Sequence, residues 1–249
     1  GMIGNGIDKR TAEKVWELFP PFARYGFNRS HAVCYALIGY QTAYLKANYP
    51  VEYMTALLNN ASGDMERISF LVNEARRVNI KVLPPDVNAS VAQFVSEGEN
   101  VRFGIMAIKN IGAHITEMLV NERMRGGPYQ SLSDLVTRIQ DRDLNKKSLE
   151  ALIKSGALDS LGIERMATLK SIEDILKFGN GLKKQNGNSQ TNLFENFSQP
   201  EIKLQKTEPA SKIERLSWEK ELLGLYVTEH PLKDFLSKME YSDKKLPAI

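Results

Sequence analysis

Apolar residues recur at three- and four-residue spacing along most of the first eighty positions, which is the period of an amphipathic helix. Residues 8–19 place Ala12, Val15, Trp16 and Phe19 on one helical face, and the Phe19-Pro20-Pro21 run predicts the end of that helix. The same spacing predicts three further helices, at 30–48, at 51–60 with Pro50 in its first turn, and at 64–78.

The rest of the chain has one pattern typical of β-strands, followed by patterns that predict shorter helices. Leu83-Pro84-Pro85-Asp86 favours extended chain, and alternating residues over 93–104 predict a hairpin around Gly98. Helices are predicted at 113–125, 131–139, 145–155 and 210–223. Between 179 and 200 the Gly, Asn, Gln, Ser and Lys content predicts a flexible segment without a core. The expected fold is mainly α, a multi-helix fragment with a small β-hairpin.

Composition places the chain among ordinary globular proteins. Its 249 residues are 42% hydrophobic and 25% charged, with a net charge of +3 that does not by itself predict a nucleic-acid partner. No apolar run approaches the roughly 18 residues of a spanning helix, so we expect no membrane contact. The single cysteine, Cys34, favours a reducing cytoplasmic location, and three scattered histidines predict no structural zinc site.

Residues 101–125 have the order of a helix-hairpin-helix unit, with a helical turn, a tight Lys109-Asn110-Ile111-Gly112 connection and a helix from Ala113. Asn and Gly tolerate left-handed backbone, so the turn can close with the N–H groups of the next helix facing outward. Such groups bind phosphate without distinguishing bases. The alternative is an ordinary helix connector capped by glycine.

A second, weaker unit of this kind is centred on Lys154-Ser155-Gly156. Two such units within about 60 residues, flanked by basic side chains, favour binding to duplex DNA. The flanking residues are Arg138, Arg142, Lys146 and Lys147.

Two further segments are candidate binding sites. Asn28, Arg29, Ser30 and His31 stand at the start of a predicted helix, where they could meet a nucleotide phosphate, although Ser30 could simply cap that helix. Gln190, Leu193 and Phe194 form an isolated motif in the polar segment, typical of a peptide that docks into a partner pocket. No catalytic motif is found, and Asp141 and Asp143 are interpreted as solvated.

Five stretches resemble the catalytic alpha subunits of the C family of bacterial replicative DNA polymerases. They are residues 22–32 (FARYGFNRSHA), 35–46 (YALIGYQTAYLK), 83–88 (LPPDVN), 155–159 (SGALD) and 221–232 (ELLGLYVTEHPL). The resemblance implies a DNA-directed DNA polymerase, a nucleotidyltransferase that uses Mg²⁺, with its metal-binding palm upstream of this segment. The chain itself is then expected to hold no metal, no cofactor and no catalytic residue.

The resemblance also implies a domain order. Residues 1–100 correspond to a fingers-type helical region, 101–178 to a tandem helix-hairpin-helix region, 179–200 to a segment that binds a sliding clamp, and 201–249 to a connector toward an oligonucleotide-binding domain. The implied partners are primer-template duplex DNA, the sliding clamp and other replicase subunits. The alternative interpretation is a non-enzymatic helix-hairpin-helix adaptor with a peptide docking motif.

Overall fold

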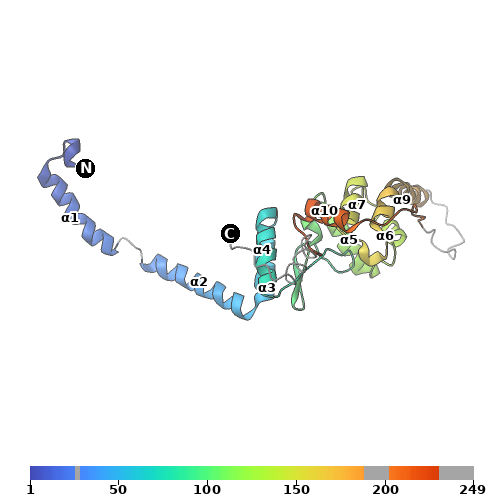
Figure 1. Ribbon diagram of the computed structural model, residues 1–249, viewed down its shortest axis with the longest axis horizontal. Helices are drawn as coiled ribbons and strands as arrows, with labels where there is room; N and C mark the ends of the chain where they lie inside the picture. The colour runs from blue at the N-terminus through green and yellow to red at the C-terminus, as the bar shows by residue number, and fades with distance from the viewer. Residues whose placement is uncertain (26–28, 188–201, 230–249) are drawn as a thin grey trace, which may run out of the picture. The chain divides into compact units, whose positions relative to one another are not determined.

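The computed structural model describes residues 1–25, 29–187 and 202–229, with the backbone alone for 22–25, 29 and 182–187 (Figure 1). The chain divides into two units, Gly1–Tyr53 and Met54–Ile249. We describe each unit separately.

The first unit contains a short 3₁₀ turn, η1 (Ile3–Asn5), and the helices α1 (Lys9–Tyr25) and α2 (Arg29–Asn48). Helix α3 (Pro50–Asn60) begins in this unit and ends in the second, with Pro50 in its first turn as predicted. The predicted end of the first helix at Phe19 is wrong, because α1 continues through Pro20 and Pro21 to Tyr25.

Two properties make this continuation physically reasonable. Proline fixes φ near the helical value, so its main cost is the missing N–H and crowding of the carbonyl four residues earlier. For Pro20 and Pro21 those carbonyls belong to Trp16 and Glu17, both of which are exposed. Water can therefore satisfy the carbonyls that lose their partners.

Helix α2 forms where it was predicted, but its apolar face is not buried within the first unit. Val33 is 66% exposed and Tyr40 70% exposed, and Leu37, Tyr44 and Leu45 are exposed as well. The periodicity therefore predicts the helix correctly. The apolar face was also expected to pack against other helices, but no described residue of this unit buries it.

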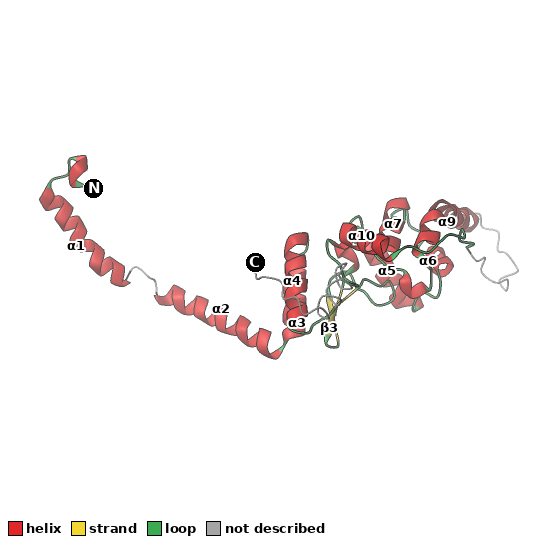
Figure 2. Cartoon of the chain, in the orientation of Figure 1, coloured by secondary structure: helices red, strands yellow, loops and turns green. Residues whose placement is uncertain are grey.

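The second unit begins with the end of α3 and with α4 (Met65–Arg77), which starts where Asp64 accepts the Arg67 N–H. Three strands follow, β1 (Val82–Leu83), β2 (Val95–Glu97) and β3 (Asn100–Arg102) (Figure 2). The predicted hairpin is confirmed, since β2 and β3 are antiparallel and turn at Gly98, which has a φ of 59°. Strand β1 pairs in parallel with β3 and was not predicted, because Pro84 and Pro85 follow only two strand residues.

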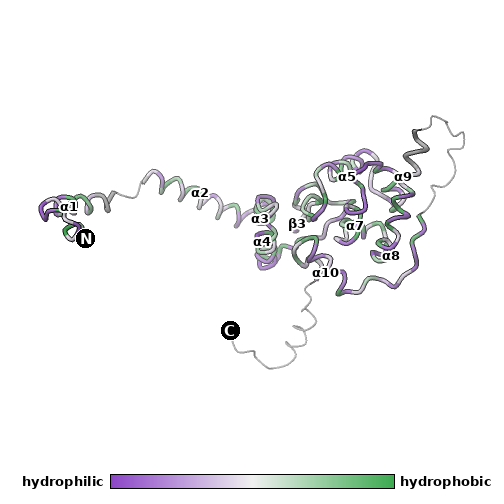
Figure 3. The backbone as a smooth tube through the Cα atoms, turned by 90° about the horizontal axis from the view of Figure 1, so that it is seen from above, coloured by the Kyte–Doolittle hydropathy of each residue, from purple (hydrophilic) through white to green (hydrophobic). Residues whose placement is uncertain are grey.

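The rest of the unit is helical. Its elements are η2 (Ile105–Ala107), α5 (Ala113–Gly126), α6 (Leu132–Arg138), α7 (Lys146–Lys154), η3 (Asp159–Leu161), α8 (Arg165–Lys170), α9 (Ile172–Gly187) and α10 (Lys212–Leu223). Hydrophobic and hydrophilic positions alternate along these helices (Figure 3), and the hydrophobic ones supply the core. Ser131, Asn145 and Ser211 cap α6, α7 and α10 through their side chains.

One boundary differs from the sequence-based expectation. Helix α9 continues to Gly187, so irregular chain does not begin at Gly179. Glycine and asparagine are weak helix formers, but Lys183, Lys184 and Gln185 are good ones, and a helix already nucleated at Ile172 extends at small cost per residue. The fold class is confirmed, because the described residues are mainly helical with a small three-stranded sheet. No described helix is long and apolar enough to cross a membrane.

Candidate nucleic-acid interface

The first hairpin joins η2 to α5 through a turn that is held by a buried side chain and by backbone hydrogen bonds. Asn110 adopts a left-handed φ of 71°, which asparagine tolerates better than most residues. The side chain of Ile111 is buried, and the Ile111 N–H donates to the Ile108 carbonyl (3.2 Å). The Lys109 N–H donates to the Leu222 carbonyl (3.0 Å), which fixes the turn to the end of α10. The turn is therefore held rigidly at the surface.

The start of α5 is open. Gly112 stands at its N-cap with a φ of −90°, so this glycine is not in the left-handed region, and no side chain caps the helix. Gly112, Ala113 and His114 are exposed, and the first turn contains no acidic residue. The unpaired N–H groups and the dipole of a 14-residue helix together favour an anion at this position.

Lys109 adds a positive charge beside this helix start. Its side chain is exposed and has no ion-pair or hydrogen-bond partner among the described residues. The structure thus places Lys109, Asn110 and Gly112 together on one exposed turn, with Ile111 as the buried anchor. An arrangement of this kind can bind a phosphate group without contacting a base.

The far end of α5 is fixed by a partly buried arginine and by a buried tyrosine that follows the helix. Arg123 Nη1 donates to the carbonyls of Val87 (2.6 Å) and Ser90 (2.7 Å), and burial lowers the pKa of this guanidinium. The Tyr129 hydroxyl donates to the Leu119 carbonyl (2.8 Å), and burial raises the pKa of Tyr129 to about 12. These contacts join the last two turns of α5 to the loop at Val87 to Ser90 and to the segment that follows the helix.

Arg138 was predicted to flank the DNA-binding units, but the structure gives it a packing role. Its guanidinium lies 4.4 Å from the centre of the Tyr129 ring and donates to Glu122 and Asp134. It also donates to the Gly127 carbonyl (2.9 Å). A cation engaged in this way is not available for phosphate.

A small cluster of polar side chains lies beside the start of α5. His114 Nε2 is 3.1 Å from Asp141 Oδ2, and Asp141 Oδ1 accepts the Asp143 N–H (2.7 Å). The interpretation of Asp141 as solvated is therefore wrong, since Asp141 is partly buried and has a contact on each carboxylate oxygen, while the printed bonds of Asp143 involve its backbone and leave the interpretation of its side chain untested. Ligand atoms of His114, Asp141 and Asp143 lie within 4.8 Å of one another and could hold a cation. His114 and Asp141 are 27 residues apart in the sequence, so their spacing gives no indication that the two side chains are in contact.

The second hairpin differs from the first in its burial. Ser155 is 1% exposed and Ala157 is fully buried, while Gly156 adopts a φ of 82°. The guanidinium of Arg165, which is 4% exposed, lies beneath Gly156 and donates to Asp159 Oδ1 (2.9 Å) and to the Lys154 carbonyl (3.1 Å). The backbone N–H groups of residues 155–157, which were expected to bind a phosphate, are therefore buried inside the protein.

The lysine of the second hairpin is also engaged. Lys154 Nζ lies 2.5 Å from Glu150 Oε1, and the Lys154 side chain is only 20% exposed. The next helical element is the short η3 turn and not an open helix start. The two units that look alike in sequence therefore offer different surfaces.

The remaining predicted site residues are only partly described. Arg29 begins α2, and exposed Ser30 and His31 follow it, with the His31 ring 4.4 Å from the Tyr35 ring. Asn28 lies outside the described residues. Gln190, Leu193 and Phe194 also lie outside them.

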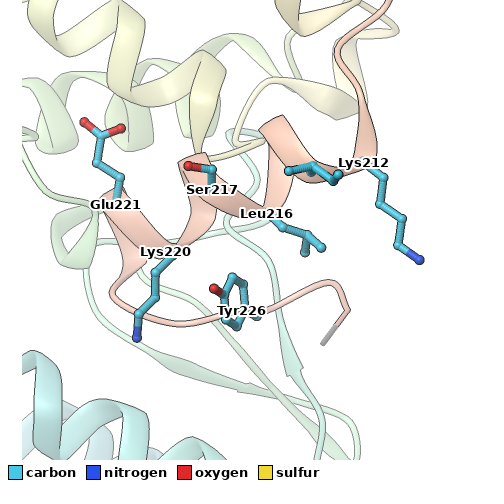
Figure 4. A pocket seen from close by; sticks show the side chains of 7 residues that line it. Lys212, Leu216, Ser217, Lys220, Glu221 and Tyr226 are labelled. Carbon is cyan, nitrogen blue, oxygen red and sulfur yellow. The ribbon is translucent and has the colours of Figure 1, made fainter. Parts of the chain in front are cut away.

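Sequence analysis did not identify an open pocket of about 760 Å³ on α10. Leu216, Lys220 and Tyr226 line it (Figure 4). Ile213, which is 80% exposed, lines it as well, and the Lys220 ammonium lies 5.8 Å from the Tyr226 ring centre. Amphipathic periodicity alone predicts that these apolar residues face the core, so the pattern contains no signal for a surface pocket.

Comparison with known proteins agrees with this geometry. A family model described as a helix-hairpin-helix motif matches residues 79–168, the range that contains both hairpins. The DNA polymerase III subunit alpha of Thermus aquaticus is 40% identical over 232 residues, which are 93% of this chain and 19% of that protein.

The corresponding subunits of Deinococcus radiodurans and Borreliella burgdorferi are 40% and 38% identical, over 94% of this chain in each case. The chain spans about a fifth of the length of these curated relatives. Over nearly its whole length, the chain is therefore homologous to one segment of the bacterial DNA polymerase III alpha subunit.

Proposed function

We propose that this chain is the part of a bacterial replicative DNA polymerase that holds duplex DNA by its phosphates, in the cytoplasm, through the first hairpin. The observation that carries the proposal is the uncapped, exposed start of α5 at Gly112. It lies within the residues that match the helix-hairpin-helix family model, and the chain is homologous to polymerase subunits. The buried second hairpin serves as support for α7 and α8.

Phosphate binding of this kind suits a polymerase that moves along DNA. Contacts to the backbone fix the position of the protein on the duplex but contain no sequence information. The affinity should fall steeply with salt, because each neutralised phosphate releases counterions, and it should change little between unrelated duplex sequences.

Two single-charge variants test which hairpin binds. Lys109→Gln removes an exposed, unpaired cation, whereas Lys154→Gln removes a cation that is paired with Glu150. In anisotropy titrations with a labelled duplex, Lys109→Gln should reduce the slope of log K against log salt by about one, and Lys154→Gln should leave it unchanged. The reverse result, or no duplex binding by the unchanged chain at low salt, contradicts the proposal.

We also propose that the parent polymerase uses Mg²⁺ and that this chain alone does not extend primers. Two-metal phosphoryl transfer requires carboxylates that hold both ions, and the family resemblance implies that those residues lie upstream of this segment. Extension of a primed template by the pure chain with Mg²⁺ and nucleotides would refute this proposal.

Clamp docking is the second proposed interaction, supported by the Gln190-x-x-Leu193-Phe194 pattern and by the family resemblance. Burial of the two apolar side chains would supply the affinity, at about 1.5 to 3 kcal/mol each before ordering costs. Calorimetry against a bacterial sliding clamp should show binding that the Leu193→Ala, Phe194→Ala double variant loses without a change in melting temperature. Equal affinity of both proteins rejects this role.

Asn28, Arg29, Ser30 and His31 are proposed to contact the phosphates of the incoming nucleotide, because a basic residue and a hydroxyl stand at the start of the 20-residue helix α2. Replacing Arg29 with alanine should weaken the binding of a nucleoside triphosphate to the chain. An unchanged dissociation constant in an equilibrium titration would contradict this assignment.

A further inference from the structure

The pocket on α10 exposes an apolar side chain at a place where a helix favours charge. Ile213 is the second residue of α10 and is 80% exposed. Leu216 and Tyr226 line the same pocket, and Leu216 points from α10 toward the side on which Tyr226 lies (Figure 4). An acidic residue would suit an exposed first turn better than isoleucine does. Such a local conflict is expected where another segment covers the surface.

The chain itself returns along this pocket after α10 ends. Gly224 turns the backbone with a φ of 74°. At the end of the helix, Lys220 Nζ donates to the Gly224 carbonyl (2.9 Å), and at its start Lys212 Nζ lies 2.7 Å from Glu229 Oε2. Residues 225–229 therefore run antiparallel to α10. Glu229, the last described residue of the chain, lies at the end of α10 that contains Ile213.

The sequence that follows Glu229 has the pattern of an amphipathic helix. It lies outside the described residues, so only its residue types are used. Pro231 suits the first turn of a helix. Apolar residues then recur at the spacing i, i+3, i+4 and i+7, which places them on one helical face. They are Leu232, Phe235, Leu236 and Met239, and the charged Lys233, Asp234 and Lys238 fall on the other faces.

We propose that residues 231–239 of this chain form a helix whose apolar face fills the pocket on α10. The segment begins two residues after Glu229, so its effective concentration at the pocket is higher than that of a separate partner. Nine helical residues span about 14 Å, the same length as the nine residues of α10 from Lys212 to Lys220 that line the pocket. An amphipathic helix in an apolar groove is a recurrent mode of recognition.

Docking would determine the path of the chain beyond the second unit's described part. The Leu222 carbonyl of α10 accepts the Lys109 N–H (3.0 Å), so the same helix supports the first hairpin. A docked segment 231–239 would thus be held to the element that supports that hairpin. This inference does not rest on the proposed DNA binding and is tested without DNA.

Replacement of Ile213 by aspartate has opposite effects for a filled and for an empty pocket. If the pocket is empty, the side chain is exposed and an acid in the first turn is favourable, so the melting temperature should stay equal or rise by about 1 to 3 °C. If the segment fills the pocket, the carboxylate is placed against its apolar face. We then expect the melting temperature of the whole chain to fall by about 3 °C or more.

Hydrogen exchange followed by mass spectrometry measures the segment directly. In the unchanged chain, the amides of residues 232–239 should exchange about tenfold or more slowly than in Ile213→Asp. Phe235→Ser with Leu236→Ser should remove the same protection. Combining this pair with Ile213→Asp should cause no further loss, because all three substitutions break one contact. As a matched control, Lys233→Ser with Lys238→Ser changes only the polar faces and should leave the protection intact.

Three results would overturn the proposal. The first is an Ile213→Asp variant that melts at or above the temperature of the unchanged chain. The second is equal exchange of residues 232–239 in the unchanged chain and in Ile213→Asp. The third is protection that rises with protein concentration together with dimers in sedimentation, since the pocket would then bind a second copy of the chain.

Discussion

Substitution of Gly112 by aspartate should strengthen the fold and abolish the proposed phosphate site at the same time. Gly112 has the extended backbone of an N-cap, with φ −90° and ψ 166°, and a side chain there would meet no described atom within 4 Å. Aspartate is a preferred N-cap residue and better than glycine by a few tenths of a kcal/mol. Its charge at the helix start adds about 0.3 to 1 kcal/mol.

The sum of these two effects is a gain of about 1 kcal/mol in the free energy of unfolding, which for a unit of this size corresponds to a melting temperature higher by about 2 to 4 °C. DNA binding should change in the opposite direction. The new carboxylate would accept the N–H groups that the phosphate needs, and loss of such charged hydrogen bonds costs about 1.5 to 3 kcal/mol. An affinity loss of about 10- to 100-fold follows.

Two control variants separate charge, capping and position in the same anisotropy assay. Gly112→Asn caps the helix without adding charge, so its binding should lie between those of the unchanged chain and Gly112→Asp. Ser131→Asp adds the same charge at the N-cap of α6 and retains a capping side chain, so duplex affinity should fall by less than about threefold. A Gly112→Asp variant that melts at or above the temperature of the unchanged chain and still binds duplex equally well would refute the reasoning.

Three further outcomes are expected from the contacts around this surface. Glu219 is 1% exposed and accepts three hydrogen bonds from Val227 and Thr228, so Glu219→Ala should lower the free energy of unfolding by about 3 kcal/mol and Glu219→Gln by about 1 in urea titrations. Asn110→Ala should cost about 1 kcal/mol in thermal melts because φ is 71°, whereas Asn110→Gly should cost nothing. Burial raises the pKa of Tyr129 to about 12 from 10.0, so the unfolded chain loses the phenol proton at a lower pH than the folded chain does. The free energy of unfolding should therefore fall by about 2 kcal/mol between pH 10 and pH 12, and Tyr129→Phe should remove this part of the fall.

Local rules predicted most helices because their signals lie within a few residues. Asp64, Ser131 and Ser211 cap the helices that they precede, and the hairpin around Gly98 forms as its alternation indicates. The Pro20-Pro21 stop signal failed because exposure of the preceding turn reduces its cost.

The candidate site was predicted less completely, because burial depends on residues that are distant in sequence. Lys109 to Gly112 and Lys154 to Gly156 both begin with a lysine and end with a glycine, yet the guanidinium of Arg165 bonds to the backbone of the second segment and Glu150 pairs with its lysine. The pairing of Lys146 with Glu173 and of His114 with Asp141 spans 27 residues in each case, so spacing rules contain no signal for either. The residue types were therefore enough to predict both hairpins. Only the tertiary contacts show that the first hairpin has an exposed helix start and that the second is buried.

The central claim, that the first hairpin and not the second meets the DNA backbone, can be tested at single amide groups. In a ¹⁵N-labelled sample of the chain, a duplex is titrated at low salt and the amide resonances are followed. We expect the Gly112, Ala113 and His114 amides to shift in proportion to bound DNA, while those of Ser155, Gly156 and Ala157 stay unchanged. Shifts confined to the second group, with none at Gly112 to His114, would contradict the claim.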